Sequence, residues 1–278
     1  MTDKLKVPST SRLILEHAIK MYESPLEKAY LDAIDFSETS RVASDIRRTC
    51  AWFSDAVCYR KKFIREAVRE RLQQQAPQQV IILGAGLDPL SLHLLETYPG
   101  SISRILEVDN GYITEKKKIY DKILQEDSPL QLILCDITDT VKLYATLGQH
   151  GFQPGEAAVI VFEGVIAYIT NEEFTGIMQL FQTDDLRNMI AMNYTIREDT
   201  VPEKFLPVHH QVIALLEQHI SGRFNLHNKT SLLALITELG GIPDRLESLS
   251  ETEKRLTGRN QVFHEPGEGI MEMASFRL

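Results

Sequence analysis

The segment Val80–Asn110 places the strongest constraint on how this chain folds. A run of four apolar residues leads directly into the turn Gly84-Ala85-Gly86, which is followed by a helical segment and a second apolar run. That second run ends at two acidic residues, Glu107 and Asp109. Strand, glycine turn, helix, strand and acid form the unit that binds an adenosine-containing cofactor at the carboxyl edge of a parallel sheet. The pattern therefore predicts a doubly wound α/β fold.

The glycine turn also indicates which kind of cofactor fits. Glycines at 84 and 86 let the backbone approach a ligand closely, because they have no Cβ. The third glycine of a dinucleotide fingerprint is missing, and Pro89 stands in its place at the start of the helix. The departure favours a mononucleoside-type cofactor over NAD. Asp88 is expected either to cap this helix or to contact the cofactor.

Two later strands also end in acidic residues. The apolar run Leu130–Cys135 is followed by Asp136 and Ile137, and the run Ala157–Phe162 is followed by Glu163. Asp136 is expected to bind an adenine amino group while the next residue packs on the ring, or else to cap a short helix. The acid after the second run is expected to face the cleft, because burying an unpaired carboxylate is costly.

The rest of the chain is expected to surround this sheet. Residues 1–75 show helical periodicity and predict an extension that covers the ligand-binding edge. Residues 76–278 are expected to form the main domain, with a helical lid inserted after the fifth strand at about 195–228. The segments Gln261–His264 and Gly269–Leu278 are predicted to be two strands of an antiparallel hairpin at the C-terminus.

Charge and cysteine content exclude several classes of function. The net charge of -9 disfavours nucleic acid as a partner, because phosphate binding requires a basic surface. The three cysteines lack metal-ligand spacing, which predicts no metal site and reduced thiols in a cytoplasmic protein. No apolar run approaches the ~20 residues of a membrane span, and the first residues lack the apolar core of a signal peptide.

Four residues outside the glycine unit are candidates for substrate chemistry. His209 or His210, in the predicted lid, is expected to act as a base or a substrate contact, with at most one of the two lining the site. Tyr168 is expected to line the cleft or to lie in the core. Arg197 follows the fifth strand and is a candidate clamp for a substrate carboxylate, because guanidinium matches carboxylate geometry.

Four motifs together resemble the leucine carboxyl methyltransferase family. They are LGAGLD at 83–88, LEVDN at 106–110, CDITD at 135–139 and FEGVIAYI at 162–169. The family belongs to the class I S-adenosylmethionine-dependent methyltransferases and includes many bacterial O-methyltransferases of secondary metabolism. The resemblance spans roughly residues 60–200. It implies a Rossmann-like, seven-stranded, mostly parallel sheet with S-adenosylmethionine as cofactor.

The resemblance also implies roles for residues around the methionine part of the cofactor. Gly84, Ala85 and Gly86 would pass beside the methionine moiety, and Glu163 would contact its ammonium group. The family's arginine for the methionine carboxylate lies in a helix before the first strand of the sheet. Arg60 is the best match, and Arg48 is a competing candidate.

The remaining roles implied by the resemblance concern the nucleoside. Asp109, with Glu107 nearby, would hold the ribose, and Asp136 and Ile137 would contact the adenine. The sequence departs from the family after GAGLD, where Pro89-Leu90 replaces threonine and arginine. Whatever those family residues do is therefore in doubt for this chain.

These expectations combine into a predicted function with two alternatives. The chain is expected to methylate a carboxylate or hydroxyl oxygen of a small molecule or carrier-bound biosynthetic intermediate, with a biosynthetic synthase as a possible partner. One alternative is a non-catalytic companion protein that binds S-adenosylmethionine. The other is an NAD-dependent oxidoreductase, which the missing third glycine and the predicted terminal hairpin disfavour.

Overall fold

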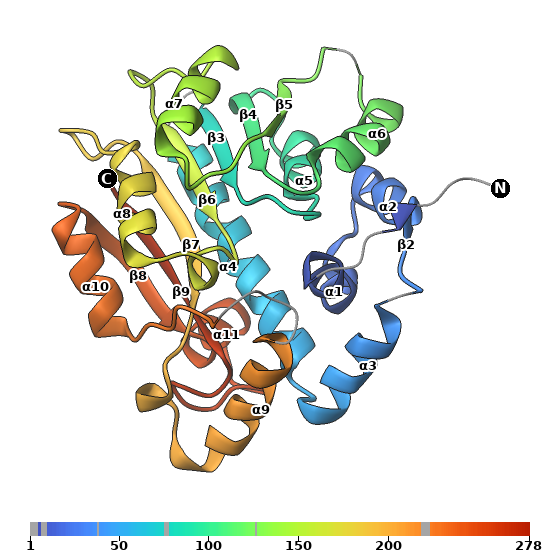
Figure 1. Ribbon diagram of the computed structural model, residues 1–278, viewed down its shortest axis with the longest axis vertical. Helices are drawn as coiled ribbons and strands as arrows, with labels where there is room; N and C mark the ends of the chain where they lie inside the picture. The colour runs from blue at the N-terminus through green and yellow to red at the C-terminus, as the bar shows by residue number, and fades with distance from the viewer. Residues whose placement is uncertain (1–4, 7–9, 38, 75–77, 126, 218–222) are drawn as a thin grey trace.

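The computed structural model describes residues 5–6, 10–37, 39–74, 78–125, 127–217 and 223–278. A seven-stranded sheet with the strand order β5-β4-β3-β6-β7-β9-β8 forms its centre (Figure 1). The strands are β3 (Gln78–Leu83), β4 (Ile102–Asp109), β5 (Leu130–Leu134), β6 (Ala158–Phe162), β7 (Met189–Thr195), β8 (Ile242–Ser248) and β9 (Met271–Arg277). The first five strands in the order run parallel, and β9 pairs antiparallel with both β7 and β8. The predicted doubly wound, mostly parallel α/β sheet is confirmed.

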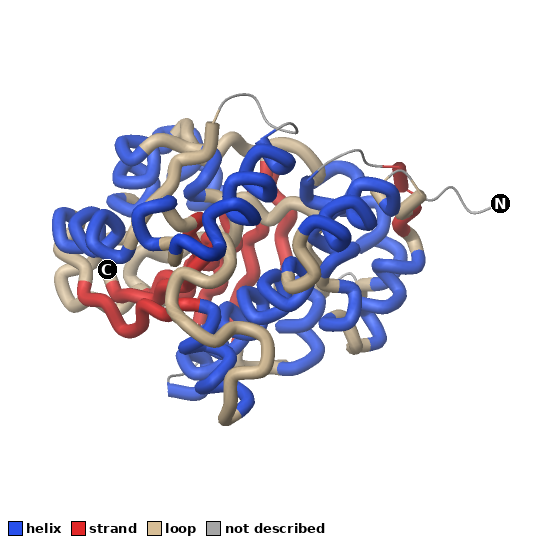
Figure 2. The backbone as a smooth tube through the Cα atoms, turned by 90° about the horizontal axis from the view of Figure 1, so that it is seen from below, coloured by secondary structure: helices blue, strands red, loops and turns tan. Residues whose placement is uncertain are grey.

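Continuous apolar runs form the central strands because helices cover both faces of the sheet (Figure 2). Along β3, Val80 and Ile82 pack in one core cluster, while Ile81 and Leu83 pack in a second cluster on the opposite face. One face carries α4 (Phe53–Gln74), α5 (Leu90–Thr97), α6 (Ile113–Ile123) and α11 (Leu249–Thr257). The other face carries α7 (Thr140–Gln149), α8 (Asn171–Gln179) and α10 (Lys229–Glu238). The strand period of two thus builds two separate cores.

The N-terminal helices lie beside this α/β core. They are α1 (Thr10–His17), α2 (Pro25–Asp32) and α3 (Ser40–Thr49), with the 3-10 turn η1 (Ile19–Met21) and the short parallel pair β1 (Leu5–Lys6) and β2 (Ile34–Asp35). Helix α4 differs from them because it packs directly on β6, β7 and β9. The predicted domain boundary at residue 75 falls directly after α4. It therefore assigns α4 to the N-terminal extension, although this helix packs on the sheet.

The C-terminal hairpin was predicted in the wrong place. The last two strands do pair antiparallel, but β8 precedes α11, and residues 261–264 form no strand. The backbone N–H groups of Gln261, Val262 and Phe263 donate to the carboxylate of Glu253 instead of to a neighbouring strand. The backbone N–H groups of residues 261–263 are thus bonded to the Glu253 carboxylate and not to a neighbouring strand.

The segment after β7 contains the turns η3 (Glu198–Thr200) and η4 (Glu203–Phe205) and the helix α9 (Leu206–Glu217). Part of the predicted lid, residues 218–222, lies outside the described residues. Within the described part of the chain, no helix combines the length and the apolar character needed to cross a membrane.

Candidate active site

A cavity of about 160 Å³ lies at the carboxyl ends of β3, β6 and β7. The glycine turn after β3 and the segment after β6, which includes the 3-10 turn η2 (Ile166–Tyr168), form one part of its wall. Helices α1, α4 and α9 also contribute to the wall, with Leu13 on α1 and Leu216 on α9 among the lining residues. Of the residues predicted from sequence, seven line this cavity: Arg60, Gly84, Ala85, Gly86, Asp88, Glu163 and Tyr168.

The glycine turn requires glycine at two positions. Gly84 and Gly86 have φ angles of 64° and 51°, in the left-handed region that side chains disfavour. A Cβ on Gly84 would lie 2.5 Å from Val165 Cγ2, and a Cβ on Gly86 would lie 3.0 Å from Ser11 Oγ. Val165 and Ser11 already occupy the space that side chains at 84 and 86 would need. The bare backbone of the turn therefore forms part of the cavity wall.

Four residues form a charged cluster beside this turn: Arg60, Lys61, Asp88 and Glu163. The Nε of Arg60 lies 2.8 Å from Glu163 Oε1, although the N–H is not aligned for a hydrogen bond. Lys61 Nζ lies 2.9 Å from the same oxygen and also contacts the Asp88 carboxylate. Two cations therefore balance two anions inside the cavity. Arg48, the competing candidate for Arg60, is exposed on α3 and does not line the cavity.

Lys61 is a site residue that the sequence analysis missed. Its side chain is 3% exposed, and it joins acids that follow two different strands. In the sequence it belongs to the run Arg60-Lys61-Lys62, which is typical of a solvated helix face. The orientation of α4 toward the sheet decides that the first two of these side chains point inward. A basic residue next to a predicted cofactor arginine is the one local signal for this role.

Asp88 belongs to the charged cluster and also contacts the first residue of α5, whose N-cap is Pro89. Its Oδ1 accepts from the backbone N–H of Leu90 at 2.9 Å, and its Oδ2 accepts from the Tyr22 hydroxyl at 2.8 Å. Burial opposes ionisation, but the charge and hydrogen bond of Lys61, with Tyr22 and Arg65, outweigh it and hold the pKa of Asp88 well below its ordinary value. Asp88 is therefore not the N-cap residue itself, although it accepts from the first N–H of the helix. Its contact with the cofactor stays a prediction.

The two acids of β4 have different surroundings. Asp109 Oδ2 accepts from the backbone N–H of Gly86 at 2.9 Å, so this carboxylate lies against the glycine turn. Glu107 is fully buried, with its Oε2 2.7 Å from Lys116 Nζ, and burial raises its pKa. It lies two residues, roughly 7 Å, before the strand tip, which is why it pairs in the core and not at the ligand edge. The prediction that Glu107 helps to hold a ribose is corrected accordingly.

Asp136 and Ile137 follow β5 at the same edge of the sheet but do not line the cavity. Asp136 is exposed, and its Oδ1 accepts from the Thr138 backbone N–H at 2.9 Å and hydroxyl at 2.8 Å, which lowers its pKa. Asp139, not Asp136, caps α7. Ile137 packs in the core with 9% of its surface exposed. The carboxylate of Asp136 therefore remains accessible.

Tyr168 lines the cavity and is 49% exposed, with its ring edge-on to Phe224 at 5.3 Å between centroids. Both rings line the cavity, one from the segment that follows β6 and one from the segment that follows α9. Among the four residues predicted for substrate chemistry, Tyr168 is the one that reaches this cavity.

The other three candidates for substrate chemistry lie elsewhere. His209 is buried on the same face of α9 as Leu216, but it lies two turns earlier and does not line the cavity. His210 is exposed and lies 2.9 Å from a carboxylate oxygen of Glu198. Arg197 is half exposed and pairs with the acid two positions later. The structure does not bring these three residues into the cavity, because the packing of α9 decides which of its residues line it and the segment after β7 brings Arg197 to Asp199.

The strand order, the glycine turn at the switch point and the enclosed cavity define a Rossmann-like methyltransferase fold. Residues 9–182 match the profile of the leucine carboxyl methyltransferase family. The chain belongs to this family and is, at the level of class, a methyltransferase.

Two solved structures share the fold over nearly the whole chain. A candidate methyltransferase from Thermobifida fusca is 12% identical, with a TM-score of 0.67, and the match covers 97% of this chain and 94% of that chain. A DUF574 family protein from Streptomyces avermitilis is also 12% identical, with a TM-score of 0.65 and coverage of 99% and 98%. No curated protein matches the sequence at a significant level.

Proposed function

We propose that the chain transfers a methyl group from S-adenosylmethionine to an oxygen atom of a small molecule or carrier-bound intermediate, and that this oxygen belongs to a carboxylate. The charge-balanced cluster of Arg60, Lys61, Asp88 and Glu163 beside the glycine turn is the observation that carries the proposal. The cofactor, when bound, supplies a methyl group already activated on a sulfonium.

The charged cluster suits the methionine end of this cofactor, which is a zwitterion. Its carboxylate needs cations, and Arg60 and Lys61 supply them. Its ammonium needs acceptors, and Glu163 and Asp88 supply carboxylate oxygens. The Nε of Arg60 is buried and lies 2.8 Å from Glu163 Oε1, but it makes no aligned hydrogen bond to a described residue, so a ligand carboxylate would satisfy it.

The nucleoside end would lie toward β4 and β5. Asp109 accepts from the backbone N–H groups of Gly86, Gly111 and Tyr112, which leaves about one of its roughly four lone-pair sites for a ribose hydroxyl. Asp136 presents an exposed carboxylate to an adenine amino group, with Ile137 beside it. This part of the proposal follows from the motifs and from the shared sheet edge.

Apart from the charged cluster, the cavity lining is mostly apolar, which favours an acceptor with an apolar body. Seven of these apolar residues come from four segments far apart in the sequence. They are Leu13, Ile14, Phe53, Leu216, Phe224, Ile270 and Met271.

A carboxylate acceptor fits the ionisable groups better than an alcohol does. A carboxylate is ionised at neutral pH and needs no base, whereas an alcohol needs one. Asp88 and Glu163 are engaged with cations, and the Tyr194 hydroxyl donates to Glu272. Tyr168 is then the candidate base among the described residues that line the cavity.

Positioning would supply most of the rate. Methyl transfer is an in-line displacement, and holding acceptor, methyl carbon and sulfur in line can give effective molarities of ~10⁵ M or more. The residues of α1 and α9 that line the cavity would exclude water and hold the acceptor's apolar body.

Calorimetric titration with S-adenosylhomocysteine tests the cofactor assignment. We expect one site with micromolar affinity. If the folded chain shows no saturable binding, the methyltransferase proposal for this cavity is wrong.

A panel of apolar carboxylic acids and alcohols, read by mass spectrometry of the methylated product, tests the acceptor. The Tyr168→Phe variant separates the two chemistries. With a carboxylate acceptor we expect kcat to stay within about twofold of the native value, because no proton has to be removed. A loss of about 10²-fold or more, restricted to alcohols, would assign Tyr168 as a base and contradict the carboxylate proposal.

A further inference from the structure

We propose a second ligand site, for a phosphate group, at the edge of the sheet opposite the cofactor cavity. A hollow of about 410 Å³ lies there between α4, the start of β7, and the strands β8 and β9. We call it the arginine hollow, because Arg71, Arg245 and Arg277 line it. It shares no lining residue with the cofactor cavity.

The sequence creates this hollow by placing polar residues where a helix normally packs against a sheet. Residues 67, 70, 71 and 74 of α4 line it and have the i, i+3, i+4, i+7 spacing of one helix face. Ala67 is the one apolar residue of the four, and Glu70, Arg71 and Gln74 follow it. Earlier turns of α4 carry buried apolar residues such as Phe63. Helix α4 therefore buries apolar side chains near its middle, whereas polar side chains line the hollow near its C-terminal end.

The strands opposite this end of α4 are polar too. Ser275 and Arg277 lie two residues apart on β9 and so share one face of the sheet. Arg245 of β8 is paired in register with Ser275, and Met189 of β7 is paired with Arg277. Polar groups therefore line the hollow from the helix and from the sheet.

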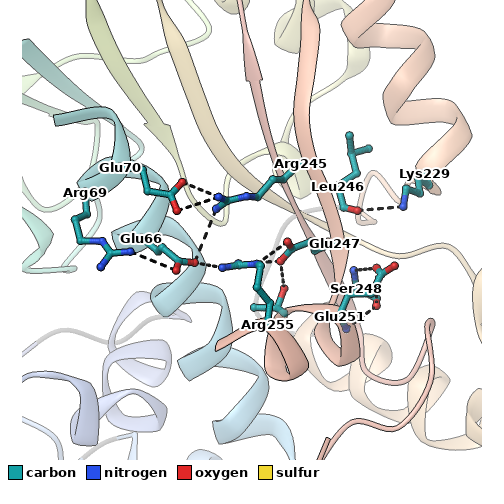
Figure 3. A network of polar contacts seen from close by, with 11 residues as sticks. Glu66, Arg69, Glu70, Lys229, Arg245, Leu246, Glu247, Ser248, Glu251 and Arg255 are labelled. Atoms are coloured by element: carbon teal, nitrogen blue, oxygen red, sulfur yellow. Dashed lines mark hydrogen bonds and ion pairs between the residues drawn. The ribbon is translucent and has the colours of Figure 1, made fainter. Parts of the chain in front are cut away.

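Two of the three arginines have carboxylate partners. Arg245 Nη2 lies 2.7 Å from Glu70, and its Nη1 lies 3.9 Å from Glu66 (Figure 3). Arg277 Nε lies 3.1 Å from Asp244. Figure 3 shows that the acids of α4 reach toward the arginines of β8 and α11, so this network holds one wall of the hollow in place.

Arg71 differs from the other two arginines. Its Nη2 donates to the backbone carbonyl of Arg187 at 2.5 Å, and its Nε is buried without a hydrogen-bond partner among the described residues. Burial lowers the pKa of the Arg71 guanidinium, Asp244 opposes this, and Arg277 adds to it. Of the charged residues that line the hollow, three are cations and two are anions, Glu70 and Asp244. Arg71 is thus a cation in the hollow with a buried donor that no described residue satisfies, and an anionic ligand would supply both the acceptor and the charge.

A phosphate group has the chemistry to fill this role. A guanidinium donates two parallel hydrogen bonds to phosphate oxygens, and Arg71 and Arg277 line the same hollow. The Ser275 hydroxyl and the Gln74 amide line it too and supply neutral donors. Arg71 and Arg60 are on the same helix, eleven residues or about 16 Å apart along its axis, so the two sites are distinct.

Calorimetric titration of the full chain with inorganic phosphate, at constant ionic strength in a chloride buffer, tests this site. We expect saturable one-to-one binding with a Kd of about 1 mM or tighter. The variant Arg71→Met should weaken binding about tenfold or more, and Arg277→Met should weaken it as well. The matched control is Arg69→Met, which removes an exposed arginine of the same helix that does not line the hollow. It should leave the affinity unchanged.

Further measurements keep the proposal falsifiable if Arg71→Met folds poorly. Arg71→Lys keeps the charge but removes the two-pronged donor, so it should also weaken binding. Glycerol 3-phosphate, compared with inorganic phosphate, shows whether the ligand is a phosphorylated small molecule or free phosphate. Absence of saturable binding by either probe up to about 10 mM, or equal weakening by the Arg71 and Arg69 variants, overturns the proposal. Binding that survives all Arg71 variants places phosphate elsewhere and overturns it too.

Discussion

At the scale of single residues, Lys61 connects two parts of the site that are far apart in the sequence. Its ammonium contacts Asp88 after β3 and Glu163 after β6, and the neighbouring Lys62 is exposed. The position of Lys61 in the cavity suits a contact with the cofactor carboxylate. A lysine that contacts the cofactor carboxylate should affect only ligands that carry the amino-acid group. A lysine that only shapes the cavity should affect all ligands alike.

We predict that Lys61→Met weakens S-adenosylhomocysteine binding about tenfold or more, because one charge-assisted hydrogen bond is lost. Affinity for 5'-methylthioadenosine, which lacks the amino-acid group, should change less than about twofold. Calorimetry with both ligands measures the difference, and Lys62→Met is the matched control. Equal weakening for both ligands would mean that Lys61 only shapes the cavity.

The buried ion pair of Glu107 and Lys116 connects two elements of the fold and is expected to matter for stability. Both side chains are fully buried, and Lys116 also donates to the backbone carbonyl of Asp88 at 2.5 Å. The pair thus joins β4 and α6 to the loop of the glycine turn.

We predict that Lys116→Met destabilises the protein by about 3–5 kcal/mol, because Glu107 is left as an uncompensated buried charge. The double variant Glu107→Leu with Lys116→Met should cost less than the single change, because neither charge remains. Urea unfolding of the two variants and the native chain provides the measurement. If the double variant is the less stable of the two, charge burial is not what governs this pair.

At the scale of secondary-structure elements, Glu253 joins α11, the loop after it and α4. Its carboxylate accepts from the N–H groups of residues 261–263 and from the hydroxyl of Tyr59 at 3.0 Å. Tyr59 precedes Arg60 on α4, so this contact fixes the helix next to the charged cluster. Burial opposes ionisation of Glu253, but the backbone donors outweigh it and lower its pKa.

We predict that Glu253→Gln lowers the free energy of unfolding by about 2–4 kcal/mol at pH 7. A lowered folded-state pKa means that the stabilisation is complete above the unfolded value of about 4.3 and is lost as pH falls through the folded pKa. The difference between native and variant should therefore shrink below about pH 4.3. Urea unfolding across this range measures it.

The control for this series is Glu265→Gln, which alters an exposed carboxylate paired with Lys204. We expect this change to cost less than about 0.5 kcal/mol at every pH. A Glu253 variant whose destabilisation stays constant as the pH falls would show that its carboxylate charge does not hold the loop.

At the scale of the whole molecule, the cavity is enclosed by segments from both ends of the sequence. Helix α1 comes before the sheet, and α9 comes after its fifth parallel strand, yet both contribute lining residues. A ligand in the cavity would contact both helices together with the strand ends. Binding should therefore order both α1 and α9, although they lie far apart in the sequence.

We predict that S-adenosylhomocysteine at about 100 times its Kd stabilises the native state by about 2.7 kcal/mol. Hydrogen exchange through local opening should slow in α1 and α9 and stay unchanged in α10, which packs on the opposite face of the sheet and lines no part of the cavity. Mass spectrometry of exchanged peptides provides the measurement. Protection confined to the sheet would show that α1 and α9 do not close on this ligand.

Much of this architecture was already visible in local patterns of the sequence. Apolar runs identified the five parallel strands, Gly84 and Gly86 marked the turn, and Glu163 was expected at the edge of the cleft. These features depend on residues close in the chain: burial on both faces needs an unbroken apolar run, and a tight turn needs glycine at its positive φ angles. Local patterns therefore predicted the fold class and the cavity wall made by the sheet.

Other features depend on how distant segments pack, and no local pattern contains that information. The angle of α4 against the sheet turns Lys61 inward and leaves Lys62 in solvent. The carboxylate of Glu253 takes the backbone donors of the segment that was expected to be a strand. The segment after β7 brings Arg197 to Asp199, and the packing of α9 brings His210 to Glu198 on the surface. In each case the outcome follows from contacts between residues far apart in the chain, which exist only once the sheet, α4 and α11 have come together.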